Sequence, residues 1–340
     1  MKKNILFCFV FVVIVLTSCN VPEKVTEEMQ RTFVASTIQA QINEMASLTP
    51  PTPTSTKRPK RTKTPTPTIT PSPTIEPTPT WITYPAGSVK LLILYYHDIV
   101  NSSKDDAYYQ WEFDHAGGPY VHSAEFEQQM RILNDMGYTT ITVSDMVKVF
   151  YEGGQLPPRP VLITFDSTEL GQWVNAYPIM KKYGMVGNLM IEAMHVDAKN
   201  SLSSEQIKTM MADGWDIGCG GYIGQPLTDR TIMSTEIGQC KTRAAEIFEK
   251  EITTFAYPDG YTDPEGFMIS RVGSYGYKAA FAGNVPTEDE VTMDNYLYIP
   301  RHEINQGMSY NDFFALLPWK EGTVSKETME WTLATPTPEQ

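Results

Sequence analysis

The chain has 340 residues, and its 40 Asp and Glu against 27 Lys and Arg give a formal net charge of -13. This surplus of acidic residues excludes nucleic acid as a partner, because phosphate recognition requires clustered Lys and Arg. Hydrophobic residues make up 41% of the chain and only 4 cysteines are present, which indicates a fold that rests on an apolar core and not on a framework of disulfides.

Residues 1–19 have the features of a bacterial export signal. Lys2 and Lys3 form the charged start, and the apolar run over residues 5–16 is too short to span a bilayer comfortably. The string Leu-Thr-Ser-Cys that ends at Cys19 is similar to the lipobox of bacterial lipoproteins. That similarity implies that Cys19 is lipidated and holds an extracytoplasmic protein on the bacterial membrane or cell surface. The alternative is an ordinary signal peptide that is cleaved nearby.

Two segments without a core of their own are expected next. Apolar residues recur at roughly helical spacing over residues 20–48, which predicts a short stalk helix. Residues 49–80 consist of Thr-Pro repeats, a composition that favours extended polyproline conformations and supplies little apolar material. We therefore expect a disordered spacer at 49–80, a folded domain over 81–332 and a disordered tail at 333–340.

Within the predicted domain, apolar runs typical of strands alternate with amphipathic helical patterns. The predicted strands cover residues 89–96, 139–143, 161–165, 186–191, 215–219, 253–257, 278–282 and 297–300. The predicted helices cover residues 123–136, 172–183, 203–213, 234–249 and 264–275. Repeated units of this kind form either an open doubly wound α/β sheet or a closed barrel, and the alternation alone does not choose between them.

Three strings in this domain carry a resemblance to a known family. They are Tyr-Tyr-His-Asp-Ile at 95–99, Pro-Pro-Arg-Pro-Val-Leu-Ile-Thr-Phe-Asp at 157–166 and Thr-Phe-Ala-Tyr-Pro-Asp-Gly at 254–260. In this order they resemble the motifs of the polysaccharide deacetylase family, also called the NodB homology domain or carbohydrate esterase family 4. The resemblance implies a distorted parallel (β/α)7 barrel, with the site at the C-terminal ends of the strands.

The chain departs from that family at its metal-ligand positions. Asp166 stands where the family has its general base, but Ser167 stands where the family has a metal-binding Asp. Gly220 and Gly224 align with the two histidines that complete the family's metal site. Because neither glycine has a side chain that can bind an ion, the resemblance implies a degenerate site. We therefore expect no cofactor and no deacetylation through a metal, since amide hydrolysis in this family depends on a metal-activated water.

A rebuilt metal site is the alternative that the histidines leave open. His97, His195 and His302 all fall near predicted strand ends, and two of them together with Asp166 form a conceivable relocated zinc site. Cys219 is a further candidate as a ligand or nucleophile, and the sequence leaves open whether it pairs with Cys240. A small half-buried thiol in a core strand is the plainer interpretation of Cys219.

The family's substrate groove has matching positions in this chain. The resemblance implies that His97, Tyr257, Pro258, Arg301 and His302 bind the substrate, because aromatic faces stack on sugar rings and polar groups fix hydroxyls. We expect Trp215, by contrast, to be barrel packing.

The sequence therefore predicts a surface lipoprotein with a deacetylase-like barrel that binds a cell-wall or extracellular polysaccharide. The first alternative is an active carbohydrate N- or O-deacetylase, which would use either a rebuilt metal site or Asp166 with His97 or His302 as acid and base. The second alternative is a surface scaffold that binds another protein and no sugar.

Overall fold

A computed structural model describes residues 80–101, 120–261, 266–284 and 289–320 of the chain. The described residues all belong to one compact unit within residues 75–340. The predicted signal, stalk helix and terminal tail lie outside the described residues, as do Cys19 and almost all of the Thr-Pro spacer. Among the described helices, none is long and apolar enough to cross a bilayer.

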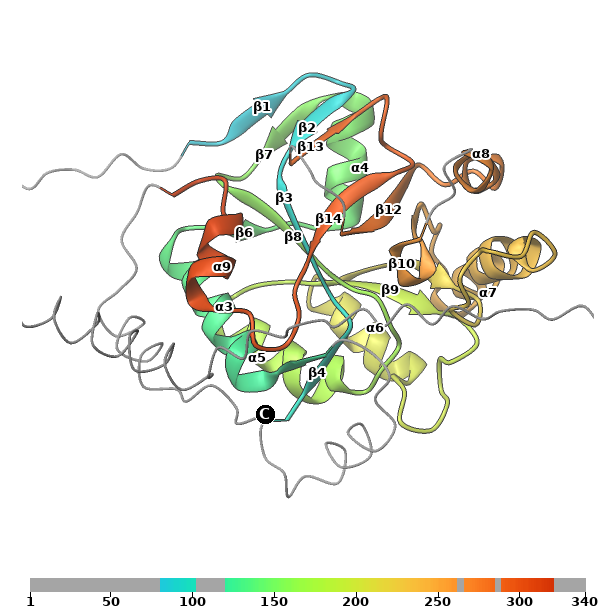
Figure 1. Ribbon diagram of the computed structural model, residues 1–340, viewed down its shortest axis with the longest axis horizontal. Coiled ribbons are helices and arrows are strands. Elements are labelled where there is room, and N and C mark those ends of the chain that lie inside the picture. The colour runs from blue at the N-terminus through green and yellow to red at the C-terminus, as the bar shows by residue number, and fades with distance from the viewer. Residues whose placement is uncertain (1–79, 102–119, 262–265, 285–288, 321–340) are drawn as a thin grey trace, which may run out of the picture. The chain divides into compact units, whose positions relative to one another are not determined.

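Seven parallel strands close into a barrel (Figure 1). In order around the barrel these are β3 (Leu92–Tyr96), β8 (Pro160–Phe165), β9 (Asn188–Glu192), β10 (Asp216–Gly221), β11 (Thr254–Ala256), β12 (Ala279–Asn284) and β14 (Ile299–Glu303). Closure occurs because β3 pairs with β14 on one side and with β8 on the other. The predicted barrel is therefore confirmed, and the open sheet is excluded.

Helices connect the strands in the manner expected of repeated βα units. They are α3 (Ser123–Asp135), α4 (Val143–Glu152), η1 (Gln172–Ala176), α5 (Tyr177–Lys182), α6 (Ser204–Ala212), η2 (Ser234–Gln239), α7 (Cys240–Phe248), α8 (Phe267–Ser274) and α9 (Tyr310–Leu316). Here η1 and η2 are short π-helical segments that run directly into α5 and α7. A 3₁₀ turn, η3 (Pro258–Gly260), follows β11.

The predicted strand over residues 139–143 is the clearest difference between expectation and structure. Only β6 (Thr139–Thr140) forms, beside β8, and α4 begins at Val143. The reason is local, because Thr142 and Asp145 form a capping box in which each side chain bonds the other residue's backbone N–H. That cap stabilises a helix start where the apolar run suggested a longer strand.

Short strand pairs cover the two ends of the barrel. The antiparallel pairs β1 (Ile82–Tyr84) with β7 (Gly154–Leu156) and β2 (Ser88–Lys90) with β13 (Glu290–Thr292) lie at the N-terminal end, since β2 and β7 directly precede β3 and β8. The parallel pair β4 (Asp98–Val100) with β5 (Tyr120–His122) follows β3 at the opposite end. Two strand pairs thus cover the N-terminal end of the barrel. The candidate site lies at the C-terminal end.

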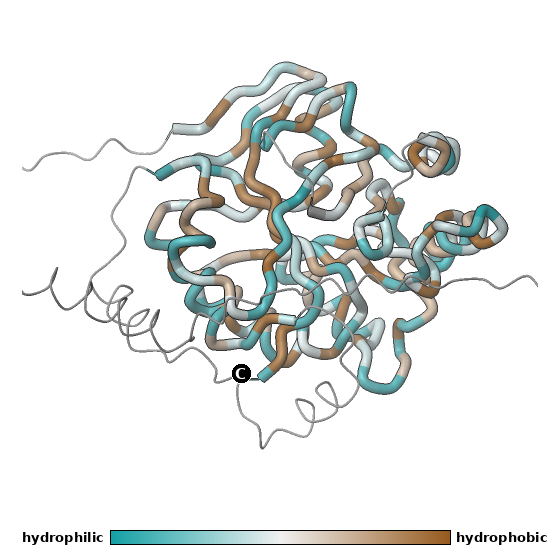
Figure 2. The backbone as a smooth tube through the Cα atoms, in the orientation of Figure 1, coloured by the Kyte–Doolittle hydropathy of each residue, from teal (hydrophilic) through white to brown (hydrophobic). Residues whose placement is uncertain are grey.

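The strand residues alternate between two apolar clusters. Leu92, Leu94 and Tyr96 of β3 belong to the cluster that includes the helix residues Phe126 and Met130. The intervening residue Ile93 belongs to the second cluster, which gathers inward-facing residues of several strands. Figure 2 shows the corresponding apolar segments along the central strands. This period of two orients every other side chain of each strand toward the barrel interior, including those nearest the C-terminal mouth.

One disulfide ties the barrel to its outer helices. Cys219 of β10 and Cys240, the first residue of α7, are bonded across a sequence separation of 21 residues. The open question of their pairing is therefore answered. Because its sulfur is bonded to Cys240, Cys219 is neither a free nucleophile nor a metal ligand, and that candidate role is wrong.

Candidate functional site

The residues that the sequence singled out lie mainly at the C-terminal end of the barrel. His97 follows β3, Asp166 follows β8, and β9, β10 and β14 end at Glu192, Gly221 and Glu303. Parallel strands bring all of these ends to one mouth, which is where barrels of this class carry their sites. The predicted location of the site is consistent with this geometry.

Asp166 is held by a bidentate ion pair with Arg301. Nη1 of Arg301 donates to Oδ1 of Asp166 at 2.6 Å and Nη2 donates to Oδ2 at 2.5 Å, and the Arg301 side chain has no solvent exposure. The guanidinium also lies over the ring of Tyr95, with 4.3 Å to the ring centroid. Both oxygens of the expected base are thus engaged by a cation. Arg301 was predicted to bind substrate, and its complete burial shows that it positions Asp166 instead.

His97 and Glu303 line the mouth beside this ion pair. Nε2 of His97 lies 3.9 Å from Oε1 of Glu303, and each side chain keeps about a fifth of its surface exposed. Burial raises the pKa of the neighbouring Tyr95, and the charge of Glu303 raises it further, so that hydroxyl stays protonated. The sequence reasoning missed Glu303, although its place two residues after Arg301 on the last strand puts it at the same mouth.

Ser167 and Thr168 form structural hydrogen bonds. Oγ of Ser167 donates to the carbonyl oxygen of His97 at 3.1 Å and accepts from Nε2 of Gln172 at 2.8 Å. Oγ1 of Thr168 accepts the backbone N–H of Glu192 at 2.8 Å. These two hydroxyls join the loop after β8 to its neighbours.

The backbone at Gly220 and Gly224 leaves no room for the family's histidines. A Cβ at position 220 would lie 2.4 Å from the carbonyl oxygen of Met190, and a Cβ at position 224 would lie 2.1 Å from Oε1 of Glu192. Gly224 also has φ +89°, a conformation that residues with a side chain adopt only with strain. A histidine at either position would require the backbone or Glu192 to move.

The residues present therefore do not fit the family's divalent metal. Zinc sites require three or more suitably placed ligands, and among the described residues no group of three or more His, Cys, Asp or Glu is arranged to hold an ion. The relocated zinc site is not supported either. His97, His195 and His302 have different carboxylate partners, namely Glu303, Glu192 and Asp289.

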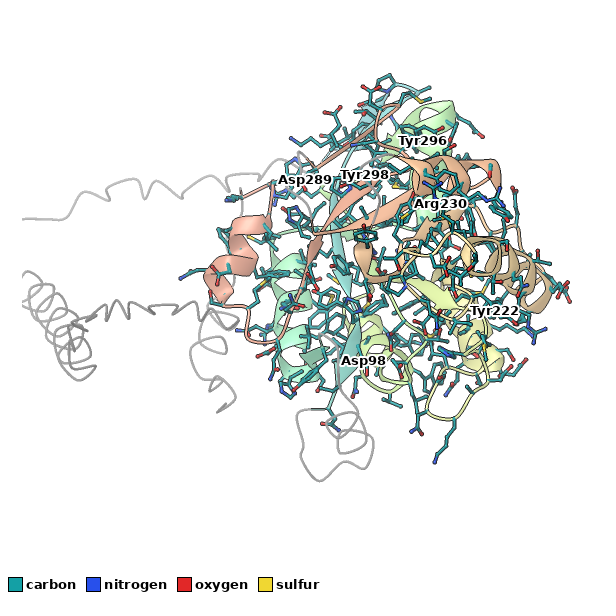
Figure 3. The ribbon with its side chains drawn as sticks, turned by 45° about the vertical axis from the view of Figure 1, so that its right-hand side comes forward. Asp98, Tyr222, Arg230, Asp289, Tyr296 and Tyr298 are labelled. Carbon is teal, nitrogen blue, oxygen red and sulfur yellow. A yellow bond between two sulfur atoms is a disulfide. The ribbon has the colours of Figure 1, made fainter. Side chains whose placement is uncertain are left out.

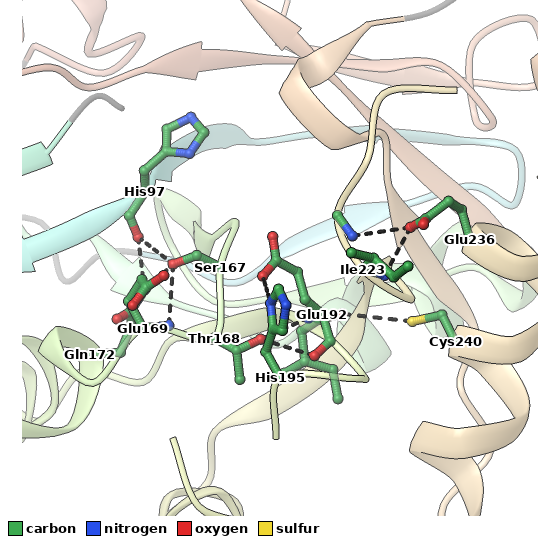
Figure 4. A network of polar contacts seen from close by, with 12 residues as sticks. His97, Ser167, Thr168, Glu169, Gln172, Glu192, His195, Ile223, Glu236 and Cys240 are labelled. Atoms are coloured by element: carbon green, nitrogen blue, oxygen red, sulfur yellow. Dashed lines mark hydrogen bonds and ion pairs between the residues drawn. The ribbon is translucent and has the colours of Figure 1, made fainter. Parts of the chain in front are cut away.

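Glu192 and His195 form a polar pair at the end of β9 (Figure 4). Nδ1 of His195 lies 2.6 Å from Oε2 of Glu192. The hydrogen bond to Glu192 raises the pKa of His195, and the charges of Glu192, Glu169 and Glu236 raise it further, while burial opposes the shift. Neither Glu192 nor this pairing was predicted, because one Glu in an apolar strand is not a signal until its neighbours are known.

Glu236 lies beneath the loop that replaces the family's histidine motif. Its side chain is 1% exposed, and its Oε2 accepts the backbone N–H groups of Ile223 and Gly224, both at 3.0 Å. Its other oxygen, Oε1, has no hydrogen-bond partner among the described residues. Figure 4 shows the carboxylate directed from η2 toward this loop.

Two of the predicted groove residues pack the barrel, and a third, His302, lies beside a carboxylate. Tyr257 and Pro258 are buried, and the Tyr257 hydroxyl donates to the carbonyl oxygen of Leu297 at 2.9 Å. They pack the barrel and offer no exposed face to a sugar, so their predicted contact with substrate is wrong. Nε2 of His302 lies 2.8 Å from Oδ1 of Asp289, with both side chains partly exposed. Trp215 is 4% exposed and stacks on Phe165, which agrees with its interpretation as packing.

Two further tyrosines follow strand ends on the C-terminal side of the barrel. Tyr222 directly follows β10 and Tyr261 follows η3, the turn after β11; Tyr222 is partly exposed and Tyr261 is 45% exposed. The loop after β10 also carries Arg230, whose guanidinium lies 4.0 Å from the ring centroid of Phe267. Figure 3 shows Tyr222 and Arg230 on the same side of the barrel. An aromatic residue within a few positions of a predicted strand end was the signal that could have identified Tyr222.

Comparison with known proteins agrees with this geometry. A family model described as polysaccharide deacetylase matches residues 153–280, from β7 to β12. The Bacillus subtilis protein YxkH, named after the polysaccharide deacetylases, is 27% identical over 201 residues, which cover 58% of this chain and 70% of that protein. The Staphylococcus aureus poly-β-1,6-N-acetyl-D-glucosamine N-deacetylase is 24% identical over 200 residues, which cover 53% of this chain and 66% of the enzyme.

A solved structure shows the same fold. The Streptococcus pyogenes deacetylase PplD, determined in complex with acetate, superposes with a TM-score of 0.56 at 20% identity, covering 67% of this chain and 98% of PplD. The superposition extends the agreement from the matched segment to the closed barrel as a whole. The described barrel therefore has the fold of these deacetylases, and residues 153–280 within it match the polysaccharide deacetylase model.

Proposed function

We propose that this chain is an extracytoplasmic, lipid-anchored protein whose barrel binds a cell-wall or extracellular polysaccharide without deacetylating it through a metal. The observation that carries the proposal is which residues stand at the positions that align with the family's metal ligands. Ser167, Gly220 and Gly224 offer no ligand set, and the carboxylate of Glu192 occupies the space beside Gly224.

The chemistry of deacetylation explains why this observation decides the proposal. A metal lowers the pKa of bound water and polarises the acetyl carbonyl, which is worth several kcal/mol of transition-state stabilisation. Without those ligands, Asp166 would have to activate bulk water alone, while both of its oxygens accept hydrogen bonds from Arg301. Asp166 therefore has no Lewis acid beside it to activate the water that it would deprotonate.

The polysaccharide partner is supported by the relatives and by the mouth of the barrel. The Staphylococcus aureus relative is named for its action on poly-β-1,6-N-acetyl-D-glucosamine, and binding can persist when a catalytic group is lost. Tyr222 and Tyr261 follow neighbouring strands β10 and β11. They provide aromatic faces of the kind that stack on sugar rings.

Acetate release and glycan retention separate the proposal from its rivals. We expect the purified protein to release no acetate from acetylated chitooligosaccharides or peptidoglycan, with or without added zinc, and to be retained on an immobilised glycan of the same panel. Tyr222→Ala and Tyr261→Ala should weaken retention. Tyr151→Ala is the matched control, because Tyr151 is a 43% exposed tyrosine on α4.

The two opposite results would each support one of the rival functions. Acetate production would show an active deacetylase and overturn the proposal. Failure to retain any glycan would favour the scaffold that binds another protein.

The anchor is tested separately. The similarity of residues 16–19 to a lipobox and the Thr-Pro spacer at 49–80 support a barrel held away from the membrane by a stalk. We expect Cys19→Ser to move the protein from the membrane fraction to the soluble extracytoplasmic fraction. Membrane retention of that variant would exclude anchoring through Cys19.

A further inference from the structure

Glu192 fills the place that a ligand histidine would need. Its Oε2 bonds to His195 at 2.6 Å, and its Oε1 is the atom that lies 2.1 Å from a Cβ built at Gly224. Thr168 fixes the backbone of Glu192 through its N–H. The carboxylate is thus positioned by His195, and it brings negative charge beside Gly224, which aligns with a histidine of the family's metal site.

The charges around Glu192 are mostly negative. Glu169 and Glu236 both contribute to the raised pKa of His195, so their charges reach the same place. The guanidinium of Arg301 is engaged with Asp166. His195 is the partner that faces Glu192, and a single imidazolium balances only one of these three carboxylates. The electrostatic potential beside Glu192 therefore favours the binding of a second cation.

Two buried acceptors independently indicate a missing donor. Oε1 of Glu236 and Oε1 of Gln172 are both buried and have no hydrogen-bond partner among the described residues. Glu236 is 1% exposed and Gln172 is 0% exposed. Glu236 bonds to the N–H of Gly224, and Gln172 bonds to Ser167, so the two lie against former ligand positions. Buried acceptors without partners are costly, and a donor-rich cationic group nearby would offset that cost.

We propose that Glu192, with the buried carboxylate of Glu236 behind the 221–224 loop, forms a subsite for the ammonium group of an amino sugar. The inference rests on the proposed function and specifies its ligand as a glycan with free amino groups in place of acetamido groups. A primary ammonium carries three N–H donors and one positive charge, which matches a site of surplus acceptors and negative charge. An acetamido group is neutral and presents one N–H, so it would leave the surplus negative charge around Glu192 unbalanced.

The experiment compares two oligosaccharides that differ only in acetylation. Calorimetric titration of the full chain uses a β-1,4-linked glucosamine hexamer and the N-acetylglucosamine hexamer at low and high salt. We expect the amino form to bind about tenfold tighter at low salt, as a charge-assisted hydrogen bond to a partly buried carboxylate predicts. Salt should reduce that preference without abolishing it, because Glu192 is about 21% exposed and screened less than a surface group.

Glu192→Gln should remove the preference, so that the two hexamers bind with similar affinity. Glu205→Gln is the matched control, since Glu205 is a surface glutamate of α6 whose side chain is 83% exposed. Glu192→Asp provides a second variant, which keeps the charge but withdraws it from Gly224 and should give an intermediate preference. Thermal unfolding of each variant confirms that it is folded.

The outcomes distinguish this inference from the proposed function. Equal or tighter binding of the acetylated hexamer, or an equal loss in Glu205→Gln, would overturn the ammonium subsite and leave a glycan-binding barrel. Absence of binding to both hexamers, together with no retention on any glycan of the wider panel, would overturn the glycan-binding function itself.

Discussion

Arg301 and Asp166 form a buried ion pair in which each partner depends on the other. The Arg301 side chain has 0% exposure, and besides Asp166 it donates to the carbonyl oxygen of Ala282 at 2.8 Å and to Oγ1 of Thr164 at 3.1 Å. Taking such a pair out of water is costly, and removing one partner leaves the other charge unpaired inside the protein. The pair thus contributes to the stability of the mouth as well as to the state of Asp166.

Arg301→Met should lower the free energy of unfolding by about 3–5 kcal/mol, because it leaves the carboxylate of Asp166 without its cation. Urea denaturation followed by circular dichroism measures the change. The double variant Arg301→Met with Asp166→Leu removes both charges and should recover most of the loss. If the double variant is as unstable as the single one, the cost lies in packing against Tyr95 and not in the unpaired charge.

His195 makes a second prediction at the level of one residue. Its pKa is raised above the usual 6.5, first by the hydrogen bond to Glu192. A raised pKa in the folded state means that the contribution to stability is complete below the unfolded value of about 6.5 and is lost as pH rises through the folded value.

We expect an NMR titration to show His195 retaining its proton above pH 6.5 and Glu192→Gln to move its pKa back toward that value. The pH dependence of the unfolding midpoint should flatten in the same variant. An unchanged His195 titration in Glu192→Gln would show that this hydrogen bond is not the main cause of the shift.

Among the elements, the close pairing of β9 with β10 decides whether histidines could be introduced at positions 220 and 224. At Gly220 the obstacle is the backbone of the neighbouring strand, since the nearest atom to a built Cβ is the carbonyl oxygen of Met190 at 2.4 Å. At Gly224 the obstacle is Glu192 together with a positive φ. Introducing metal ligands here would therefore require a change in the spacing of two paired strands as well as three substitutions.

The variant Ser167→Asp/Gly220→His/Gly224→His should not bind zinc stoichiometrically and should unfold at a lower temperature than the parent. The strained backbone at 224 alone costs about 1–3 kcal/mol. Calorimetric titration with zinc and thermal unfolding measure the two effects, with Ser167→Asp alone as the control for added negative charge. Tight zinc binding by a variant of unchanged stability would show that the strands adapt readily.

For the whole molecule, the described barrel contains both apolar clusters in full. The segment before it is rich in Thr and Pro, and such a composition supplies little apolar surface to bury. The folded unit therefore owes its stability to the barrel's own core and to the bond between Cys219 and Cys240.

Removal of residues 1–74 should leave the unfolding midpoint of the remaining chain within a few degrees of the full-length value. Differential scanning calorimetry of both forms in reducing and non-reducing buffer measures this, and reduction should lower both midpoints equally. A large drop on truncation alone would show that residues 1–74 stabilise the barrel.

The sequence by itself determined the class of fold and which residues stand at the positions that align with the family's metal ligands. Strand and helix patterns repeat over short windows, so seven barrel strands could be placed within a few residues, and family strings around Asp166 located the lost positions. Glycine has no side chain in any conformation, so the sequence is enough to show that Gly220 and Gly224 provide no side-chain ligand for an ion.

Only the tertiary structure decided what took the place of those ligands. Which way Tyr257 faces, which cation pairs with Asp166 and where the carboxylate of Glu192 lies depend on barrel closure and on the register of neighbouring strands. Those contacts join residues far apart in the chain, such as 166 with 301 and 192 with 224. Local pattern carries no information about them, because side-chain direction at a strand end is set by the partners that packing brings there.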